Sequence, residues 1–209
     1  MIFSDRKDAA HRLVKELEQY RGQNPLVLAI PRGAVPMAKI IADELGGEVD
    51  VVLVRKLRAP GNPEFAIGSV DESGWTYLGD YAGRVGGSSQ YIETEKETQL
   101  QVMRERRASY TPIRPPHDPA GRIVIVVDDG LATGSTMIAA LHSLRAKSPK
   151  KLICAVPVAP PDTLAKVRPY ADEVVCLSAP EMFYAVGQFY ASFPQVSDEE
   201  VIALLKATP

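Results

Sequence analysis

Cysteine is scarce in this sequence, and patterns typical of disulfides or metal sites are missing. The 209 residues include two cysteines, Cys154 and Cys176, and three histidines, and both cysteines lie in apolar runs. A disulfide framework or a zinc site requires more such side chains at closer spacing. We therefore expect two buried thiols, and neither a disulfide framework nor a zinc site.

The sequence also lacks an excess of charge and long hydrophobic stretches. Its formal net charge is -2 and its isoelectric point is about 6.0, so no positive field of the whole chain would attract nucleic acid or an anionic membrane. No stretch reaches the roughly 20 apolar residues of a membrane span. Residues 1–17 mix acids with bases in place of the apolar core of a signal peptide. We expect a cytoplasmic protein that binds neither nucleic acid nor membranes.

Strand-like and helix-like segments alternate along the chain. Short apolar runs typical of buried strands occupy residues 26–30, 49–56, 123–127, 152–158 and 173–179. Helical patterns occupy residues 4–20, 34–45, 135–147 and 162–170. Helices between buried strands at this spacing predict an α/β fold, with a Rossmann-like parallel sheet flanked by helices.

Two segments depart from this alternation. Residues 57–62 are rich in turn-forming residues and lead into an expected hairpin across residues 71–74. Residues 88–110 are highly charged and contain neither glycine nor proline, which predicts one long helix with a solvated face. The proline-rich residues 111–121 are interpreted as a surface loop and not as a domain boundary, because the strands on either side fit one sheet.

The most informative stretch is VVDDGLATGST, residues 126–136, at the end of an apolar run. Parallel α/β sheets bind ligands beyond the carboxyl ends of their strands, where Asp128 and Asp129 are expected. The turn that follows enters a helix, whose free N–H groups favour a phosphate, and Gly134 allows close approach of the backbone. Adjacent carboxylates would repel a phosphate, but they accept hydrogen bonds from neighbouring hydroxyls of a ribose. A phosphorylated pentose fits both halves of the motif.

The longer string IVIVVDDGLATGST resembles the phosphoribosyl pyrophosphate (PRPP) motif of type I phosphoribosyltransferases. The resemblance implies that Asp128 and Asp129 hold the ribose 2′- and 3′-hydroxyls. It also implies a cradle for the 5′-phosphate formed by Ala132, Thr133, Gly134, Ser135 and Thr136. PRPP would bring Mg2+, which binds such sites through substrate oxygens, waters and one or two carboxylates, so the two aspartates would contact the metal indirectly. The Walker string GxxxxGK is absent, which argues against an ATPase.

A second basic turn, IPRGAVP, follows the first apolar run. By the same resemblance, Arg32 and Gly33 form the loop that binds pyrophosphate, with a cis peptide between Pro31 and Arg32. Arg55 and Lys56 match the strand end that precedes the catalytic loop of the family and would contribute to the same site. The alternative for Arg32 is an ordinary surface arginine at the start of a helix.

Residues 56–80 match the lid and hairpin of this family. We expect residues 55–66 to be mobile without ligand, because they offer little apolar surface, and to exclude water from the reaction centre when they close. The alternative is a plain hairpin connection. Glu64 in this segment is the candidate general base, and a solvated loop glutamate is its alternative.

Residues 178–209 resemble the C-terminal hood of hypoxanthine-guanine phosphoribosyltransferases, in which Tyr184 would stack on the base. An equally supported alternative is that Tyr184 and its aromatic neighbours only pack against helices. Ala132 and Ala191 stand where that group carries acids, which argues against a 6-oxopurine acceptor. The acceptor is left open as a small nitrogenous compound such as a nucleobase.

The resemblance covers nearly the whole chain and implies one phosphoribosyltransferase domain, residues 1–209. Such an enzyme would depend on Mg2+, transfer the phosphoribosyl group of PRPP to a nitrogen acceptor and release pyrophosphate, and relatives are commonly homodimers. A second hypothesis is a regulator that senses PRPP or a nucleotide in the same pocket. A sugar-phosphate hydrolase is a third, but it would leave Arg32 and Gly33 without a purpose.

Overall fold

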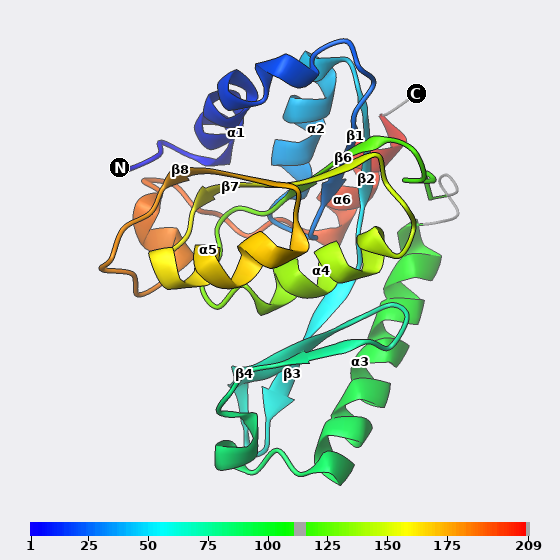
Figure 1. The fold of residues 1–209 in the computed structure, drawn as a ribbon, viewed down its shortest axis with the longest axis vertical. Helices are drawn as coiled ribbons and strands as arrows, with labels where there is room; N and C mark the ends of the chain where they lie inside the picture. The colour runs from blue at the N-terminus through cyan, green and yellow to red at the C-terminus, as the bar shows by residue number, and fades with distance from the viewer. Residues whose placement is uncertain (111–115, 208–209) are drawn as a thin grey trace.

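A five-stranded parallel sheet forms the centre of the molecule (Figure 1). The computed structural model describes residues 1–110 and 116–207, and of residue 64 it describes the backbone only. The strand order is β2-β1-β6-β7-β8, with the bounds β1 Leu26–Ala29, β2 Glu48–Val51, β6 Ile123–Val127, β7 Lys151–Val158 and β8 Glu173–Ser178. All neighbouring pairs are parallel. The predicted α/β fold with a parallel sheet is confirmed.

Helices cover both faces of this sheet (Figure 1). They are α1 Arg6–Glu16, α2 Val35–Leu45, α4 Ser135–Arg145 and α5 Pro161–Val167. The first two lie on one face and the last two on the other. Within the part of the chain that the structure describes, no helix is both long and apolar enough to cross a membrane.

Alternate residues of β6 face the two helical layers. Ile125 and Val127 belong to the apolar cluster that includes α1 and α2, whereas Val124 and Val126 belong to the cluster that includes α4. None of the four has exposed surface. A strand covered on both faces is apolar at every position, which is why this one appears in the sequence as a continuous hydrophobic run.

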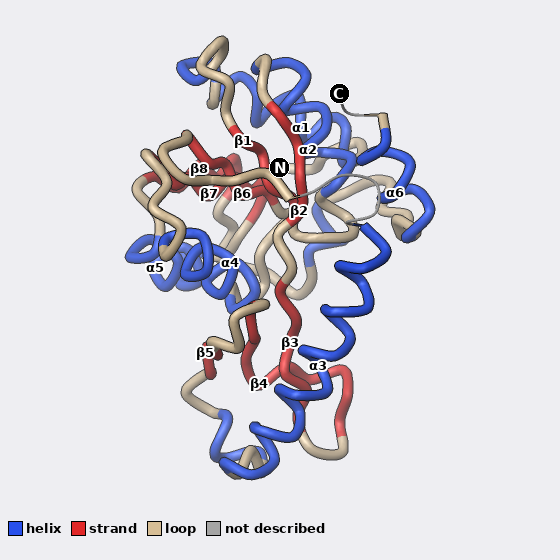
Figure 2. The backbone as a smooth tube through the Cα atoms, turned by 90° about the vertical axis from the view of Figure 1, so that its right-hand side faces the viewer, coloured by secondary structure: helices blue, strands red, loops and turns tan. Residues whose placement is uncertain are grey.

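A three-stranded antiparallel sheet extends away from the main body (Figures 1 and 2). Its strands are β3 Val54–Ala59, β4 Asn62–Asp71 and β5 Thr76–Leu78. The long helix α3 Ser89–Tyr110 packs along β3. The hairpin predicted across residues 71–74 and the long helix predicted for residues 88–110 are therefore both confirmed.

The remaining elements are short or lie at the end of the chain. They are η1 Glu18–Tyr20, η2 Ala82–Val85, η3 Arg168–Tyr170 and η4 Val186–Phe189, which are 3-10 helices, and α6 Asp198–Lys206. Two predicted helices are thus shorter than expected: those over residues 4–20 and 162–170 each consist of an α-helix followed by a 3-10 turn. Part of the loop expected over residues 111–121 lies outside the described residues.

The prediction of one strand over residues 49–56 is wrong. β2 ends at Val51, β3 begins at Val54, and the two strands belong to different sheets. Val52 and Leu53 between them are buried, with 6% and 3% of their surface exposed. Because these two residues are also apolar, the apolar run is uninterrupted where the chain passes from one sheet to the other. Hydrophobicity alone does not reveal this crossing.

The expectation of two buried thiols holds for one cysteine only. Both cysteines are free, and Cys154 on β7 is buried. Cys176 is partly exposed because β8 is the edge strand of the sheet and pairs only with β7.

The segment expected as a lid, residues 55–66, is a β-hairpin. β3 and β4 pair antiparallel and join through Pro60 and Gly61, whose φ of 70° suits a tight turn. The pairing shifts register on either side of Arg58. Strand pairing thus replaces the expected loop, and mobility of this hairpin without ligand stays a prediction.

The hood predicted over residues 178–209 rests on the N-terminal segment. The Phe3 N–H donates to the Phe189 carbonyl at 2.8 Å, and the Ala191 N–H donates to the Phe3 carbonyl at 2.8 Å. These bonds join Phe3 and Tyr190 in a parallel bridge outside the two sheets. The N-terminal segment and residues 189–191 of the hood therefore meet outside the two sheets.

Asp71 anchors the turn between β4 and β5. Its side chain has no exposed surface, and Oδ1 accepts hydrogen bonds from the Ser73 N–H at 2.8 Å, the Ser73 hydroxyl at 2.5 Å and the Trp75 N–H at 3.1 Å. The Trp75 ring stacks on His142 of α4, with ring centroids 3.7 Å apart. This turn therefore fixes the antiparallel sheet against α4.

Replacing Asp71 with alanine (Asp71→Ala) leaves the donors of this turn without their acceptor. We expect the free energy of unfolding to fall by about 1 to 3 kcal/mol. Asp80→Ala, at an exposed position after β5, is the control and should change it by less than about 0.5 kcal/mol. Urea unfolding followed by circular dichroism measures both variants. Equal stability of Asp71→Ala and wild type would show that other contacts hold the turn.

Candidate functional site

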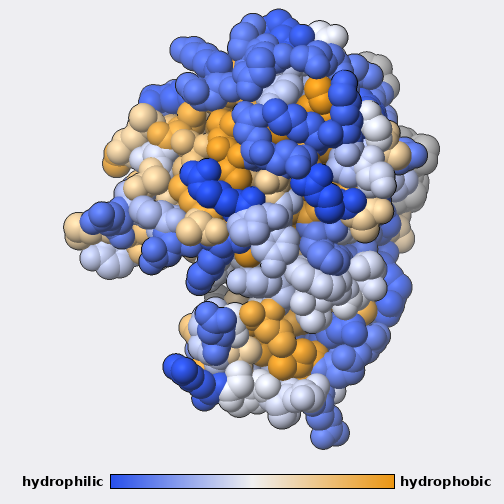
Figure 3. Space-filling view, viewed as in Figure 1, coloured by the Kyte–Doolittle hydropathy of each residue, from blue (hydrophilic) through white to orange (hydrophobic). Residues whose placement is uncertain are grey.

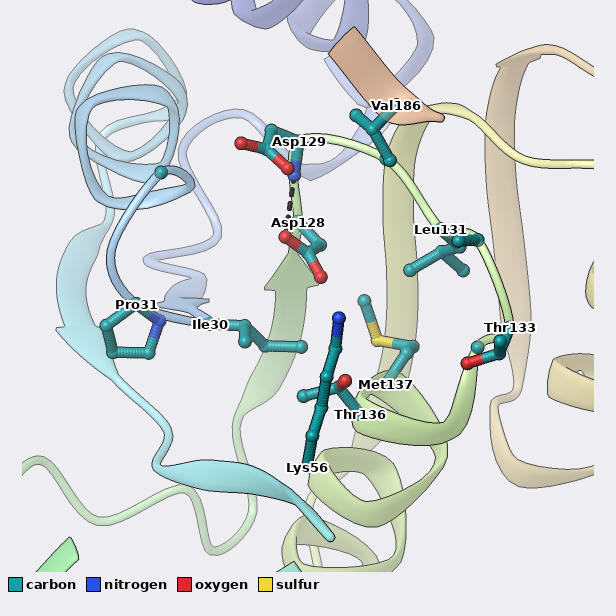
Figure 4. Close-up of a pocket in the computed structure, with 14 residues that line it drawn as sticks. Ile30, Pro31, Lys56, Asp128, Asp129, Leu131, Thr133, Thr136, Met137 and Val186 are labelled. Atoms are coloured by element: carbon teal, nitrogen blue, oxygen red, sulfur yellow. Dashed lines mark hydrogen bonds between the residues drawn. The ribbon is translucent and has the colours of Figure 1, made fainter. Parts of the chain in front are cut away.

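A cavity of about 280 Å3 lies at the carboxyl ends of β1 and β6 (Figure 4). Its lining residues are Ile30, Pro31, Gly33, Lys56, Asp128, Asp129, Gly130, Leu131, Ala132, Thr133, Gly134, Thr136, Met137 and Val186. They come from the turns after β1 and β6, from β3, from the first turn of α4 and from the hood. The structure thus brings the two turns that the sequence singles out into one cavity.

Asp128 and Asp129 stand directly after β6. The Asp128 carboxylate accepts a hydrogen bond from the Asp129 N–H at 2.8 Å (Figure 4). Burial raises the pKa of Asp128 well above its usual range, the negative charge of Asp129 raises it further, and Lys56 opposes the shift. Burial also raises the pKa of Asp129, and Arg6 opposes that shift. Hydrogen-bond donors or a cation in the cavity would therefore stabilise the ionised pair.

Lys56 brings positive charge to these carboxylates from the second sheet. Its side chain extends from β3 toward Asp128 (Figure 4). Its neighbour Arg55 points elsewhere, because Arg55 Nε donates to Gln99 Oε1 on α3 at 3.0 Å. Of this predicted pair, the structure places only Lys56 in the cavity.

The turn before α4 offers backbone donors to an anion. Gly134 is the N-cap of α4, with φ 78°, and has no side chain to cap the helix, while Thr133 Oγ1 accepts a long hydrogen bond of 3.5 Å from the Ser135 N–H. A Cβ on Gly134 would lie 2.8 Å from Thr163 Cγ2 of α5. The Ala132 carbonyl points away from the cavity, where it accepts a hydrogen bond from the Thr163 hydroxyl at 2.6 Å. Helix N-termini with free N–H groups bind phosphates, so the geometry fits a phosphate site.

Ser135 belongs to the far side of this turn. It lines a second cavity of about 240 Å3 together with residues of β4, β5 and α5, and it does not line the first. Its carbonyl accepts a hydrogen bond from the Ser69 hydroxyl at 2.6 Å. Figure 3 shows the surface hollowed between the main body and the part that carries the antiparallel sheet. Of the five residues predicted for the phosphate cradle, four thus line the main cavity.

The turn after β1 contains the predicted cis peptide between Pro31 and Arg32. Gly33 lies against Asp129, since a Cβ at this position would be 2.3 Å from Asp129 Oδ2. Arg32 points away from the cavity, with its Nη1 3.8 Å from Asp198 Oδ2 on α6. Gly33 therefore contributes to the cavity in the described structure, and Arg32 does not.

The hood contributes a different residue from the one predicted. Val186 lines the cavity, and its Cγ1 is 2.7 Å from where a Cβ on Gly130 would lie. Tyr184 is 82% exposed and is not among the lining residues, so its stacking on a base stays a prediction. Glu64 belongs to β4, and its side chain lies outside the part of the chain that the structure describes.

Arg6 is a residue of this site that the sequence does not predict. This first residue of α1 donates from Nε to Asp129 Oδ2 at 2.9 Å, across 123 positions of the chain. In the sequence it is one of several charges in an amphipathic helix, and nothing in its spacing indicates a partner at the end of β6. Tyr190 is missed for the same reason, and its hydroxyl donates to the Asp129 carbonyl at 2.6 Å.

The carboxylates fit a metal ion only together with a ligand. No group of three or more His, Cys, Asp or Glu side chains that could hold an ion occurs among residues 1–110 and 116–207. Asp128 and Asp129 offer hard oxygen atoms next to an anion site, and Mg2+ favours such oxygens combined with phosphate oxygens and water. The residues present therefore fit Mg2+ that arrives with a phosphorylated substrate.

The sheet and the cavity define the class of protein. The family described as "Phosphoribosyl transferase domain" matches residues 4–194, and the chain belongs to this family. The match includes both turns that line the cavity, the antiparallel sheet and the start of the hood. The family resemblance inferred from the PRPP motif is confirmed.

Two proteins are similar over nearly the whole chain. "Putative phosphoribosyl transferase Rv0571c" of Mycobacterium tuberculosis (strain H37Rv) is 41% identical over 205 residues, which are 98% of this chain and 46% of that protein. The chain thus spans about half the length of this curated relative. The crystal structure of TT1426 from Thermus thermophilus is 45% identical and has a TM-score of 0.82, over 99% of this chain and 98% of that chain. A shorter match, 42% identical over 59 residues, links 28% of this chain to the uracil phosphoribosyltransferase of Clostridioides difficile (strain 630).

The variant Gly33→Ala tests whether Asp129 contributes to the binding of PRPP. In Gly33→Ala the new Cβ would displace the Asp129 carboxylate, and we expect PRPP to bind at least about tenfold more weakly, or 1.4 kcal/mol, in the presence of Mg2+. Gly83→Ala is the matched control, because a Cβ there has no neighbour within 4 Å. Isothermal titration calorimetry measures both affinities. Wild-type affinity in Gly33→Ala would separate Asp129 from PRPP binding.

Proposed function

We propose that this protein is a Mg2+-dependent phosphoribosyltransferase that moves the phosphoribosyl group of PRPP to a nitrogen atom of a small acceptor and releases pyrophosphate. The observation that carries the proposal is one cavity that combines the partly buried Asp128 and Asp129 with the N-terminus of α4, whose N-cap Gly134 has no side chain. A diol and a phosphate on the same ligand would satisfy both features at once. Membership of the family supports the reaction class.

In this proposal PRPP, the phosphoribosyl donor, lies along the carboxyl ends of β6 and β1. The 5′-phosphate accepts N–H groups of the turn at residues 132–136, and the ribose hydroxyls donate to Asp128 and Asp129. The pyrophosphate then reaches Gly33 and Lys56 on the opposite side of the cavity. The lining supports this order, because both binding turns border the same space.

Arg32 and Arg55 would add charge to the pyrophosphate site after a local rearrangement. Arg32 faces Asp198, and Arg55 is hydrogen-bonded to Gln99, so each has another partner in the described structure. Burial lowers the pKa of Arg55, and the nearby positive charge of Arg106 lowers it further. A pyrophosphate would relieve this repulsion, which favours movement of the arginines toward it.

The reaction centre needs negative charge and little water. Departure of pyrophosphate leaves positive charge at C1 of the ribose, as in the cleavage of a glycoside. Mg2+ would neutralise the leaving pyrophosphate. Asp128 and Asp129 lie beside the ribose in this arrangement and would stabilise the positive charge. The β3–β4 hairpin, which carries Lys56 into the cavity, is the element placed to exclude water.

A regulator that senses PRPP or a nucleotide is the second candidate. One observation favours it: the N–H groups of Tyr184 and Ala185 in the hood both donate to Gln188 Oε1, at 2.8 and 3.0 Å. At these two positions the hood therefore presents no free N–H to an acceptor base. The regulator shares PRPP binding with the enzyme and differs in turnover.

One assay separates the two candidates. Wild-type protein is incubated with PRPP and Mg2+ and with adenine, hypoxanthine, guanine, pyrimidines or small amines, and pyrophosphate release is recorded. Release that depends on one acceptor supports the transferase. Tight PRPP binding without release for any acceptor supports the regulator.

The two carboxylates are tested together. In Asp128→Asn with Asp129→Asn the charge-assisted bonds to the ribose are lost, and each is worth about 1.5 to 3 kcal/mol of binding. We expect calorimetry to detect no PRPP binding, while circular dichroism retains the wild-type spectrum. Equal PRPP affinity of variant and wild type would end the assignment of these residues to the ribose.

Proton removal from the acceptor is assigned to Glu64 in this proposal. Ala132 and Ala191 supply no acid, so we expect hypoxanthine and guanine to be poor acceptors and adenine or a small amine to be better. Glu64→Gln should lower kcat about 100-fold or more with little change in PRPP affinity, because general bases contribute about that much to the rate. Steady-state kinetics and calorimetry provide the two values. Unchanged kcat with the best acceptor would place the base elsewhere.

A further inference from the structure

Arg6 contacts three parts of the molecule at once. Its Nε and Nη2 lie 2.9 Å from Asp129 Oδ2, and its Nη1 donates to the Pro194 carbonyl at 2.5 Å. Its Cζ is 3.9 Å from the centroid of the Phe193 ring. One guanidinium therefore joins α1, the carboxylate at the end of β6 and the hood segment that contains Phe193 and Pro194.

The hood contacts Asp129 by a second route. The Tyr190 hydroxyl donates to the Asp129 carbonyl at 2.6 Å, and the rings of Tyr190 and Phe193 are 4.8 Å apart. Asp129 is thus linked to the hood through its backbone by Tyr190 and through its side chain by Arg6. A movement of Asp129 would therefore disturb its contact with Tyr190 and, through Arg6, the contacts with the hood.

The same hood segment is held by the backbone of the residues before α1. Phe3 exchanges hydrogen bonds with Phe189 and Ala191, and the Ser192 N–H donates to the Ser4 carbonyl at 3.0 Å. Residues 189–194, which we call the hood strip, therefore run beside the segment that ends at Arg6. The arginine is connected to the hood strip by its side chain and through the adjoining backbone.

The pair of Arg6 and Asp129 is shielded from water. Their side chains are 11% and 16% exposed. By contrast, Arg12, about one and two-thirds turns further along α1, pairs with Asp8 at 2.9 Å, and these side chains are 39% and 27% exposed. A shielded, hydrogen-bonded pair is much more sensitive to the loss of one partner than an exposed pair on a helix surface. Loss of Arg6 is therefore expected to have a larger effect than loss of Arg12, whose guanidinium lies 5.4 Å from the centroid of the Phe3 ring.

We propose that Arg6 is a positioning residue that couples PRPP binding at Asp129 to the ordering of the hood strip, residues 189–194. This inference rests on the proposed function, because PRPP is the ligand expected at Asp129. A ribose hydroxyl on Asp129 fixes the carboxylate, the carboxylate fixes the guanidinium, and the guanidinium fixes Phe193 and Pro194. Coupling between sites is reciprocal, so an ordered hood strip also favours the binding of PRPP.

The geometry of the guanidinium is essential to this coupling. Its planar fork reaches Asp129 with two nitrogens and Pro194 with the third while its face lies on Phe193. An ammonium group carries the same charge but cannot make these contacts together. Arg6→Lys therefore removes the bridge while it retains a cation beside Asp129.

Hydrogen exchange of the hood strip tests the inference, with and without saturating PRPP and Mg2+. In the wild type and in the control Lys7→Ala, which removes an exposed charge of α1, PRPP should slow exchange in residues 189–194. In Arg6→Lys and Arg6→Ala this slowing should be lost, and calorimetry should show PRPP affinity reduced about tenfold in Arg6→Ala, within the roughly 5- to 150-fold range of typical couplings. Arg6→Lys serves where Arg6→Ala does not fold.

Two results would overturn the coupling while the proposed function stands. One is PRPP binding to the wild type without slower exchange in the hood strip. The other is the same slowing in Arg6→Lys as in the wild type, which would make the arginine a structural residue only. If the wild type did not bind PRPP, the proposed function would be wrong, and the coupling that rests on it would be wrong too.

Discussion

Two neighbouring carboxylates at the end of a buried strand are the constraint on which the rest of this structure depends. Desolvation and mutual repulsion oppose ionisation of Asp128 and Asp129 together. The positive groups that oppose this effect come from outside the strand, Lys56 from β3 and Arg6 from α1. The main sheet, the antiparallel sheet and the N-terminal helix therefore have to assemble before the cavity has its charge balance.

The sequence predicts the parts of this site that are local in the chain. β6, the two aspartates and the turn into α4 are consecutive, so a continuous apolar run followed by acids and small residues indicates their arrangement. The turn after β1 follows the same rule and places Gly33 in the cavity. The parallel sheet is predictable for the same reason, since covered strands and their helices alternate along the chain.

The features that the sequence does not predict depend on contacts between distant segments. Arg6 meets Asp129 across 123 positions, and no local pattern distinguishes it from the other charges of α1. Val52 and Leu53 lie between Val51 and Val54 with no polar residue to mark a boundary, so the crossing between the sheets is concealed. Tyr184 occupies the expected position in the hood sequence, yet its direction depends on how the hood packs, and it faces solvent.

The crossing at Val52 and Leu53 carries the chain from the main sheet into the antiparallel sheet, and the turn at Asp71 fixes that second sheet against α4. Lys56 lies three residues beyond Leu53, about 10 Å along an extended strand, whereas Gly61 at the hairpin tip lies about 26 Å along it. Lys56 is therefore close to the crossing, whereas the hairpin tip is more than twice as far from it along the strand. The lysine that opposes the pKa shift of Asp128 therefore stands on the part of the antiparallel sheet next to the main sheet, and the charge balance of the cavity depends on how the two sheets pack together.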